Sequence, residues 1–162
     1  MKYIVLIACM TFNAYAQFTT SEAKVIAAYP LTVEKMNHTF QASLELARLS
    51  ASDSEFKRQL QSGNHETLEG QIHVFESLPK AAGIIRSHDL SVRDYCLATM
   101  AINLAMLPEG RMPEAARSKG WQSDPVYGGV STEHIRFVDA HMAEIRKSKS
   151  ELLAIYKASN GK

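Results

Sequence analysis

The stretch SVRDYCLATMAINLAML, residues 91–107, decides the fold class. From Val92 to Leu107 its only charged side chains are Arg93 and Asp94, both in the first turn of the helix that the pattern predicts. A helix that is apolar on all sides normally lies at the centre of a protein core. It is also shorter than the roughly 20 residues that a membrane-spanning helix needs. The stretch therefore predicts a central helix with other helices packed around it.

Apolar residues recur at three- and four-residue spacing on both sides of this stretch, which is typical of amphipathic helices. One such stripe follows Thr32, a residue type that often caps a helix. No pair of alternating stretches joined by a hairpin turn is visible, so the sequence predicts an all-α helical bundle. After a polar lead-in at 17–30, we expect four main helices at 32–51, 65–77, 91–107 and 132–158, and shorter ones at 53–62 and 79–87.

The N-terminus has the pattern of a secretory signal peptide. Lys2 precedes a short apolar run, and Ala14-Tyr15-Ala16 fits the small-x-small cleavage pattern. We expect residues 1–16 to be removed and the mature protein to be periplasmic or secreted. In the alternative route, Leu6-Ile7-Ala8-Cys9 acts as a lipoprotein box and the lipid is attached to Cys9, but the apolar run before Cys9 is very short for that route.

The expected mature chain, residues 17–162, fits a single helical domain. Removing 16 of the 162 residues leaves 146, which is long enough for a real core. With Lys2 gone, 17 basic and 17 acidic residues remain, so the net charge is zero with neutral histidines. A balanced chain without a Lys/Arg run does not suggest a nucleic-acid partner. Cys96 is left alone, which excludes an internal disulfide and favours a small buried core residue.

The connection at residues 108–130 is long for a compact domain. It contains three prolines, four glycines, the only tryptophan, Trp121, and Tyr127. Loops of this length are often functional. Trp121 and Tyr127 are therefore candidate ligand- or partner-binding residues, and the alternative is a packed loop that covers one end of the core.

Asn103 is the most distinctive polar residue, because it lies between Ile102 and Leu104 in the most apolar helix. An unpaired buried amide costs roughly 1–3 kcal/mol, so Asn103 needs a hydrogen-bond partner. The favoured interpretation is a core hydrogen bond to a helix backbone or to Tyr95. The functional alternative is a ligand contact inside the bundle.

Histidines supply the alternative hypothesis of a metal- or haem-binding bundle. His134 and His141 lie seven residues apart in one predicted helix, about 10.5 Å along its axis, which is too far for one ion to bridge. Glu69 and His73 form an i,i+4 pair that could hold one ion. No C-x-x-C-H sequence is present, so covalent haem attachment is excluded. We expect no cofactor.

Hydrolase signatures are absent: the chain has no G-x-S-x-G and no H-E-x-x-H sequence. An extracytoplasmic hydrolase with dispersed carboxylates is the second alternative, because only spatial separation decides whether two carboxylates act together. No catalytic residue is predicted, and we expect the protein not to be an enzyme.

Four stretches together resemble a family of exported, all-helical bacterial proteins of uncharacterised (hypothetical) function. They are YPLTVEKM at 29–36, Leu78-Pro79 with the Ala/Ile-rich turn after it, LSVRDY at 90–95, and VSTEHIRFVDAHMAEI at 130–145. The resemblance implies an exported helical protein and gives no catalytic residues. The missing catalytic signatures, the lack of a disulfide and the long aromatic-bearing connection favour a non-enzymatic module that binds a protein partner or a small apolar ligand.

Overall fold

The computed structural model describes residues 19–106 and 131–160. These residues form eight α-helices and contain no strand, which confirms the predicted all-α fold. No helix in these two ranges is long and apolar enough to cross a membrane. The helices are α1 (Thr20–Ala27), α2 (Val33–Ser52), α3 (Ser54–Ser62), α4 (Leu68–Ser77), α5 (Pro79–Ser87), α6 (Val92–Met106), α8 (Thr132–Ala140) and α9 (Met142–Asn160).

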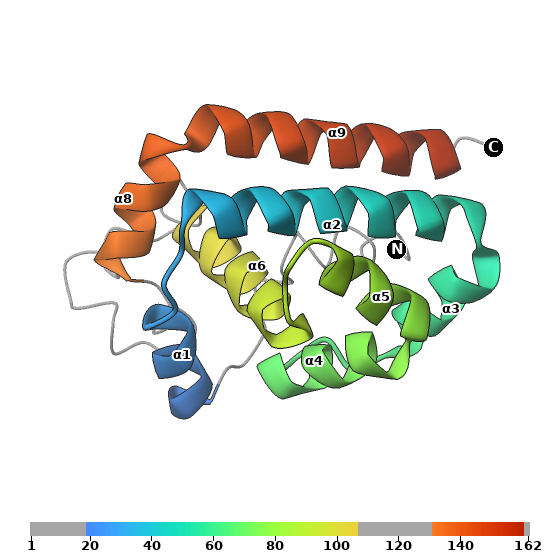
Figure 1. Ribbon diagram of the computed structural model, residues 1–162, viewed down its shortest axis with the longest axis horizontal. Coiled ribbons are helices and arrows are strands. Elements are labelled where there is room, and N and C mark those ends of the chain that lie inside the picture. Colours follow the sequence, from blue (N-terminus) through green and yellow to red (C-terminus); the bar gives the residue numbers. More distant parts are fainter. Residues whose placement is uncertain (1–18, 107–130, 161–162) are drawn as a thin grey trace.

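Helix α6 is the centre of the bundle, as its sequence predicts. Twelve of its fifteen residues are buried, and it contacts α1, α2, α4, α5 and α8. The two longest helices, α2 and α9, lie side by side and run in the same direction along one side of the molecule (Figure 1). Two buried clusters result: a large one around α6 and α4, and a smaller one where α2, α6, α8 and α9 meet.

Helix starts are set by capping side chains. Thr32 and Ser131 accept hydrogen bonds from the backbone N–H groups of Lys35 and His134, and the cap at Thr32 was predicted. Helix α3 is capped by Asp53, whose side chain accepts from the backbone N–H of Phe56. The predicted helix at 65–77 begins only at Leu68, because Thr67 supplies the cap.

The polar lead-in predicted at residues 17–30 was wrong, because it contains helix α1. Thr19 and Glu22 form a reciprocal capping box, and Ala23 and Ile26 are buried against the core. Two buried residues in eight are too few to give a periodic signal. Helix α1 is held by tertiary packing more than by its own pattern.

The single predicted helix at 132–158 was also wrong, because the chain turns at His141 and forms two helices that point in different directions (Figure 1). His141 leaves helical geometry, and its N–H bonds the carbonyls of Phe137 and Val138. The turn lets Val138 of α8 and Ile145 of α9 both enter the smaller cluster, where both are fully buried. Cys96 is buried, as expected.

Candidate functional site

A hydrogen bond links α6 to α9 beside the smaller cluster. We call this place the seam, and it comprises Ile102 and Asn103 of α6 and Ile145, Lys149 and Leu152 of α9. The ammonium group of Lys149 donates a hydrogen bond of 2.9 Å to Asn103 Oδ1, 46 residues earlier in the chain. Asn103 is buried, with 7% of its surface exposed, and Lys149 is half-buried. The predicted partner of Asn103, a helix backbone or Tyr95, is therefore replaced by a charged side chain from another helix. Tyr95 instead shares a hydrogen bond of 2.9 Å with Ser43.

The same face of α6 carries two polar atoms without partners. Within the described part of the chain, neither Asn103 Nδ2 nor Thr99 Oγ1 makes a hydrogen bond, and both atoms are fully buried. Thr99 precedes Asn103 by four residues, so the two side chains project from the same side of the helix. Buried polar atoms are almost always satisfied in proteins, and each exception needs a structural or functional explanation.

Lys149 sits in an apolar environment on its own helix. Ile145, one turn before it, is fully buried, and Leu152, one turn after it, packs against the same cluster. Burial lowers the pKa of Lys149 to about 8, because a charged ammonium loses hydration there. No carboxylate of the described residues forms an ion pair with it. The seam thus holds a cation that nothing in the described structure neutralises.

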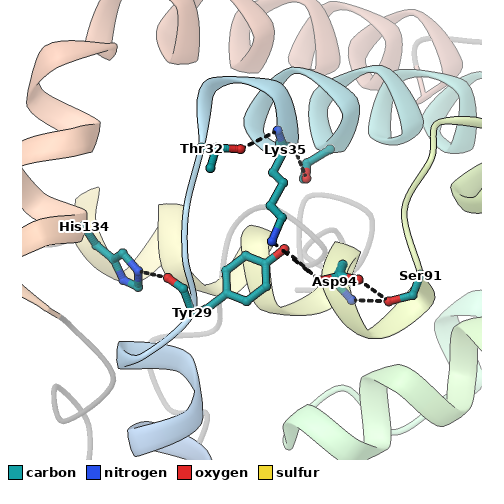
Figure 2. A network of polar contacts seen from close by, with 7 residues as sticks. Tyr29, Thr32, Lys35, Ser91, Asp94 and His134 are labelled. Carbon is teal, nitrogen blue, oxygen red and sulfur yellow. Dashed lines mark hydrogen bonds and ion pairs between the residues drawn. The ribbon is translucent and has the colours of Figure 1, made fainter.

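A second polar network lies at the start of α6 (Figure 2). The hydroxyl of Tyr29 donates to Asp94 Oδ1 at 3.1 Å, and Lys35 Nζ lies 4.0 Å from that oxygen and 4.5 Å from the centre of the Tyr29 ring. Ser91 caps α6 by accepting from the backbone N–H of Asp94, and its hydroxyl bonds the Asp94 carboxylate.

This network is explained by structure alone. Burial, and then the charge of Asp94 and its hydrogen bond, raise the pKa of Tyr29 well above its usual range, so Tyr29 stays a protonated donor and is unsuited to act as a base. Asp94 is matched by Lys35 and Ser91 and has no unmet hydrogen-bonding need that would attract a ligand. The contacts attach the segment before α2 to the N-terminal end of α6.

The two histidines of the metal hypothesis have separate surroundings. His134 is buried, and its Nε2–H donates to the backbone carbonyl of Tyr29 at 2.7 Å (Figure 2). His141 ends α8, is half-buried, and lies against the ring of Phe137 at a centroid distance of 4.6 Å. The geometry of one continuous helix, on which their predicted placement rested, is not present.

The other predicted metal-binding pair, Glu69 and His73, has surroundings that differ from those of a metal site. Glu69 accepts a hydrogen bond of 2.9 Å from Arg93, and His73 is exposed to solvent. In residues 19–106 and 131–160, no three His, Cys, Asp or Glu side chains come together in a way that could hold a metal ion. Trp121 and Tyr127, the loop candidates, lie outside the described residues.

A surface hollow of about 430 Å³ lies where the N-terminal ends of α1 and α4 meet, next to Arg93. Its charged groups already have partners. Glu22 accepts from the backbone N–H groups of Thr19 and Leu68, and Glu69 pairs with Arg93. We therefore place the candidate site at the seam. There the buried polar atoms of Asn103 and Thr99 have no hydrogen-bond partner among the described residues, and Lys149 has no carboxylate partner among them.

Sequence reasoning identified Asn103 but missed Lys149 and Thr99. The available signal was Lys149 itself, a lysine on the apolar stripe that Ile145 and Leu152 mark. A lysine at such a position often extends its ammonium to solvent, so the sequence could not distinguish that arrangement from a contact with Asn103.

Comparisons with protein-family models, curated proteins and solved structures give no match. The resemblance to exported helical proteins therefore stays a prediction.

Proposed function

We propose that this protein is a non-enzymatic binding module that acts outside the cytoplasm and takes a small ligand at the seam between α6 and α9. One observation carries the proposal. An unneutralised lysine is bonded to a buried asparagine whose amide N–H groups have no partner in the described structure. Thr99 adds a third polar group on the same face.

The stability of the fold does not explain this arrangement. A buried amide without partners costs about 1–3 kcal/mol, and a desolvated ammonium adds to that cost. Apolar side chains at the same positions would avoid both costs. Groups that violate local packing rules without a stabilising benefit are concentrated at binding and catalytic sites.

The composition of the seam indicates the class of ligand. Binding sites for small molecules are mostly apolar, with a few polar groups that fix the orientation of the ligand. Here the apolar neighbours are Ile102 and Ile145, which are buried, and Leu152, which is partly buried. The polar groups of Thr99 and Asn103 lie on the same helix as Ile102. The ligand that suits this surface is apolar over most of its length and carries a hydrogen-bond acceptor at one end.

Binding can be tested by NMR titration of the uniformly ¹⁵N-labelled mature protein with three C8 probes: 2-octanone, 1-octanol and octanoate. We expect a saturable shift of the Asn103 side-chain amide signal, which is assigned by its loss in the Asn103→Leu variant. Backbone signals of Ile102 and Ile145 should move with it. Shifts of these signals by any of the probes would support a binding site at the seam.

A double variant, Asn103→Leu with Lys149→Met, removes the polar groups while the apolar seam remains. It should bind the probes at least about tenfold more weakly than the wild type, which corresponds to about 1.4 kcal/mol. Lys147→Met is the matched control, because Lys147 is exposed two residues away on the same helix. The proposal fails if no probe gives saturable shifts at the seam, or if the double variant binds as tightly as the wild type.

A further inference from the structure

The polar groups of the seam have unused hydrogen-bond donors, whereas buried polar groups in a protein core normally have partners. Lys149 has three N–H donors, and one of them is used by Asn103 Oδ1. Both N–H donors of Asn103 Nδ2, and the hydroxyl of Thr99, are unused within the described structure. The unused capacity is therefore mainly of donors, and the acceptor oxygen of Asn103 is already occupied.

The seam also has an unbalanced charge. Among the described residues, Lys149 has no carboxylate partner, and α6 contributes only Arg93 and Asp94 as charged side chains, both in its first turn. Asp94 is already bonded to Tyr29 and Ser91 at that end of α6. Among the described residues, no negative charge therefore pairs with Lys149 near Asn103, which lies about two and a half turns after Asp94.

We infer that Thr99, Asn103 and Lys149 form the head-group site for a carboxylate at the end of an apolar chain. This inference rests on the proposed function and names its ligand class. A carboxylate offers two acceptor oxygens with about four lone-pair sites and one negative charge, which matches the unused donors and the ammonium. A neutral carbonyl would match the donors and leave the charge unpaired.

The position of Lys149 suits a head-group site at the edge of the core. Its side chain is half-buried, and its ammonium lies 2.9 Å from the side-chain oxygen of buried Asn103. The apolar residues Ile145 and Leu152 lie on either side of it along α9. A charge-assisted hydrogen bond is roughly twice as strong as a neutral one, so the site should favour a carboxylate over a ketone of equal length.

The experiment compares octanoate with 2-octanone on the wild-type mature protein, with the Asn103 side-chain amide as the site-specific NMR signal. We expect octanoate to bind about tenfold or more tightly than 2-octanone. In Lys149→Met this preference should disappear, so that the two probes bind alike. Thr99→Val, a milder change of similar volume, should weaken octanoate binding about two- to tenfold.

Lys147→Met is the control for overall charge, because it removes an exposed lysine two residues away and should keep the preference for octanoate. If octanoate and 2-octanone bind the wild type equally well, the carboxylate site is wrong and the binding module survives. If Lys147→Met loses the preference as Lys149→Met does, the attraction is a general charge effect and the inference also falls. If neither probe nor 1-octanol binds, the proposed function itself is wrong.

Discussion

The imidazole Nε2–H of His134 donates a hydrogen bond of 2.7 Å to the backbone carbonyl of Tyr29, which lies 105 residues earlier in the chain (Figure 2). Both residues are buried. The contact joins α8 to the segment between α1 and α2, and it satisfies a carbonyl that belongs to no helix. A histidine proposed as a metal ligand from sequence is therefore a structural donor here.

Replacing His134 by leucine should destabilise the protein by about 1–3 kcal/mol, because the buried carbonyl of Tyr29 loses its donor. The measurement is the free energy of unfolding by urea. His73→Leu is the control, since His73 is exposed and should change stability by less than about 0.5 kcal/mol. Equal stability of the His134 variant and the wild type would show that the contact contributes nothing.

Two glycines should respond in opposite directions to substitution by alanine. A Cβ at Gly63 would collide with the side chain of buried Val74, whereas a Cβ at Gly83, within α5, would meet nothing within 4 Å. Gly63→Ala should therefore destabilise by about 1–3 kcal/mol. Gly83→Ala should stabilise by about 0.5–1 kcal/mol, because alanine favours the helix. Thermal unfolding of the two variants checks both signs, and a shift in the same direction would refute the packing argument.

Glu22 should make the fold sensitive to acid. Burial alone would raise its pKa, but hydrogen bonds from Thr19 and from the backbone of Leu68 and Glu69 outweigh burial and lower the pKa below 4.5. A depressed carboxyl pKa gives stability that is present above 4.5 and is lost as the pH falls through the folded-state pKa. The wild type should therefore lose its stability advantage over Glu22→Gln on acidification.

The measurement for Glu22 is urea unfolding of wild type and Glu22→Gln between pH 6 and pH 3. Glu151→Gln, a change at an exposed glutamate of α9, serves as the control and should follow the wild type at every pH. A constant difference between wild type and Glu22→Gln across this range would mean that the charge of Glu22 is not what stabilises the helix ends.

Substitutions of Asn103 and Lys149 should have strongly non-additive effects on the free energy of unfolding. Asn103→Leu alone leaves the half-buried ammonium without its partner and should cost about 1–3 kcal/mol. The double variant with Lys149→Met removes both polar groups and should be at least as stable as the wild type. A double-mutant cycle based on urea unfolding gives the coupling energy. If the double variant is less stable than Asn103→Leu alone, the polar pair is there for stability and not for binding.

Lys149 should also make the free energy of unfolding rise with pH in the alkaline range. Its pKa is about 8 in the fold against 10.5 for an ordinary lysine, so the folded chain holds fewer protons between these values than the unfolded chain. The penalty for burying the charge is therefore complete below pH 8 and is removed as the pH rises to 10.5. The wild type should gain about 1–3 kcal/mol relative to Lys149→Met over this range, allowing for partial exposure of the side chain.

This gain is measured as the difference in unfolding free energy between wild type and Lys149→Met at pH 7, 8, 9 and 10. The comparison removes the contribution of other titrating groups, including Tyr29, because both proteins share them. A difference that stays flat from pH 7 to pH 10 would show that Lys149 titrates as a fully hydrated lysine.

Sequence alone determined the all-α fold and the central place of residues 91–107, because a mostly apolar stretch of sixteen residues after the capping Ser91 has few other solutions. It also placed α2, α3, α5 and α6 within one residue at each end. These boundaries depend on local chemistry: Thr32 caps α2, Ser91 precedes α6, and Pro79 begins α5. Local signals of this kind act without help from the rest of the chain.

Only the tertiary structure decided the break at His141, the helix at Thr20–Ala27 and the contact between Asn103 and Lys149. The break lets Val138 of α8 and Ile145 of α9 pack into one cluster from two different directions. No proline or glycine in the sequence indicates this break. The contact joins residues 46 positions apart. The pKa of Lys149 in this contact depends on the side chains that bury its ammonium. Sequence periodicity reports which side of a helix is buried, but the partner across the seam is chosen by how the helices pack.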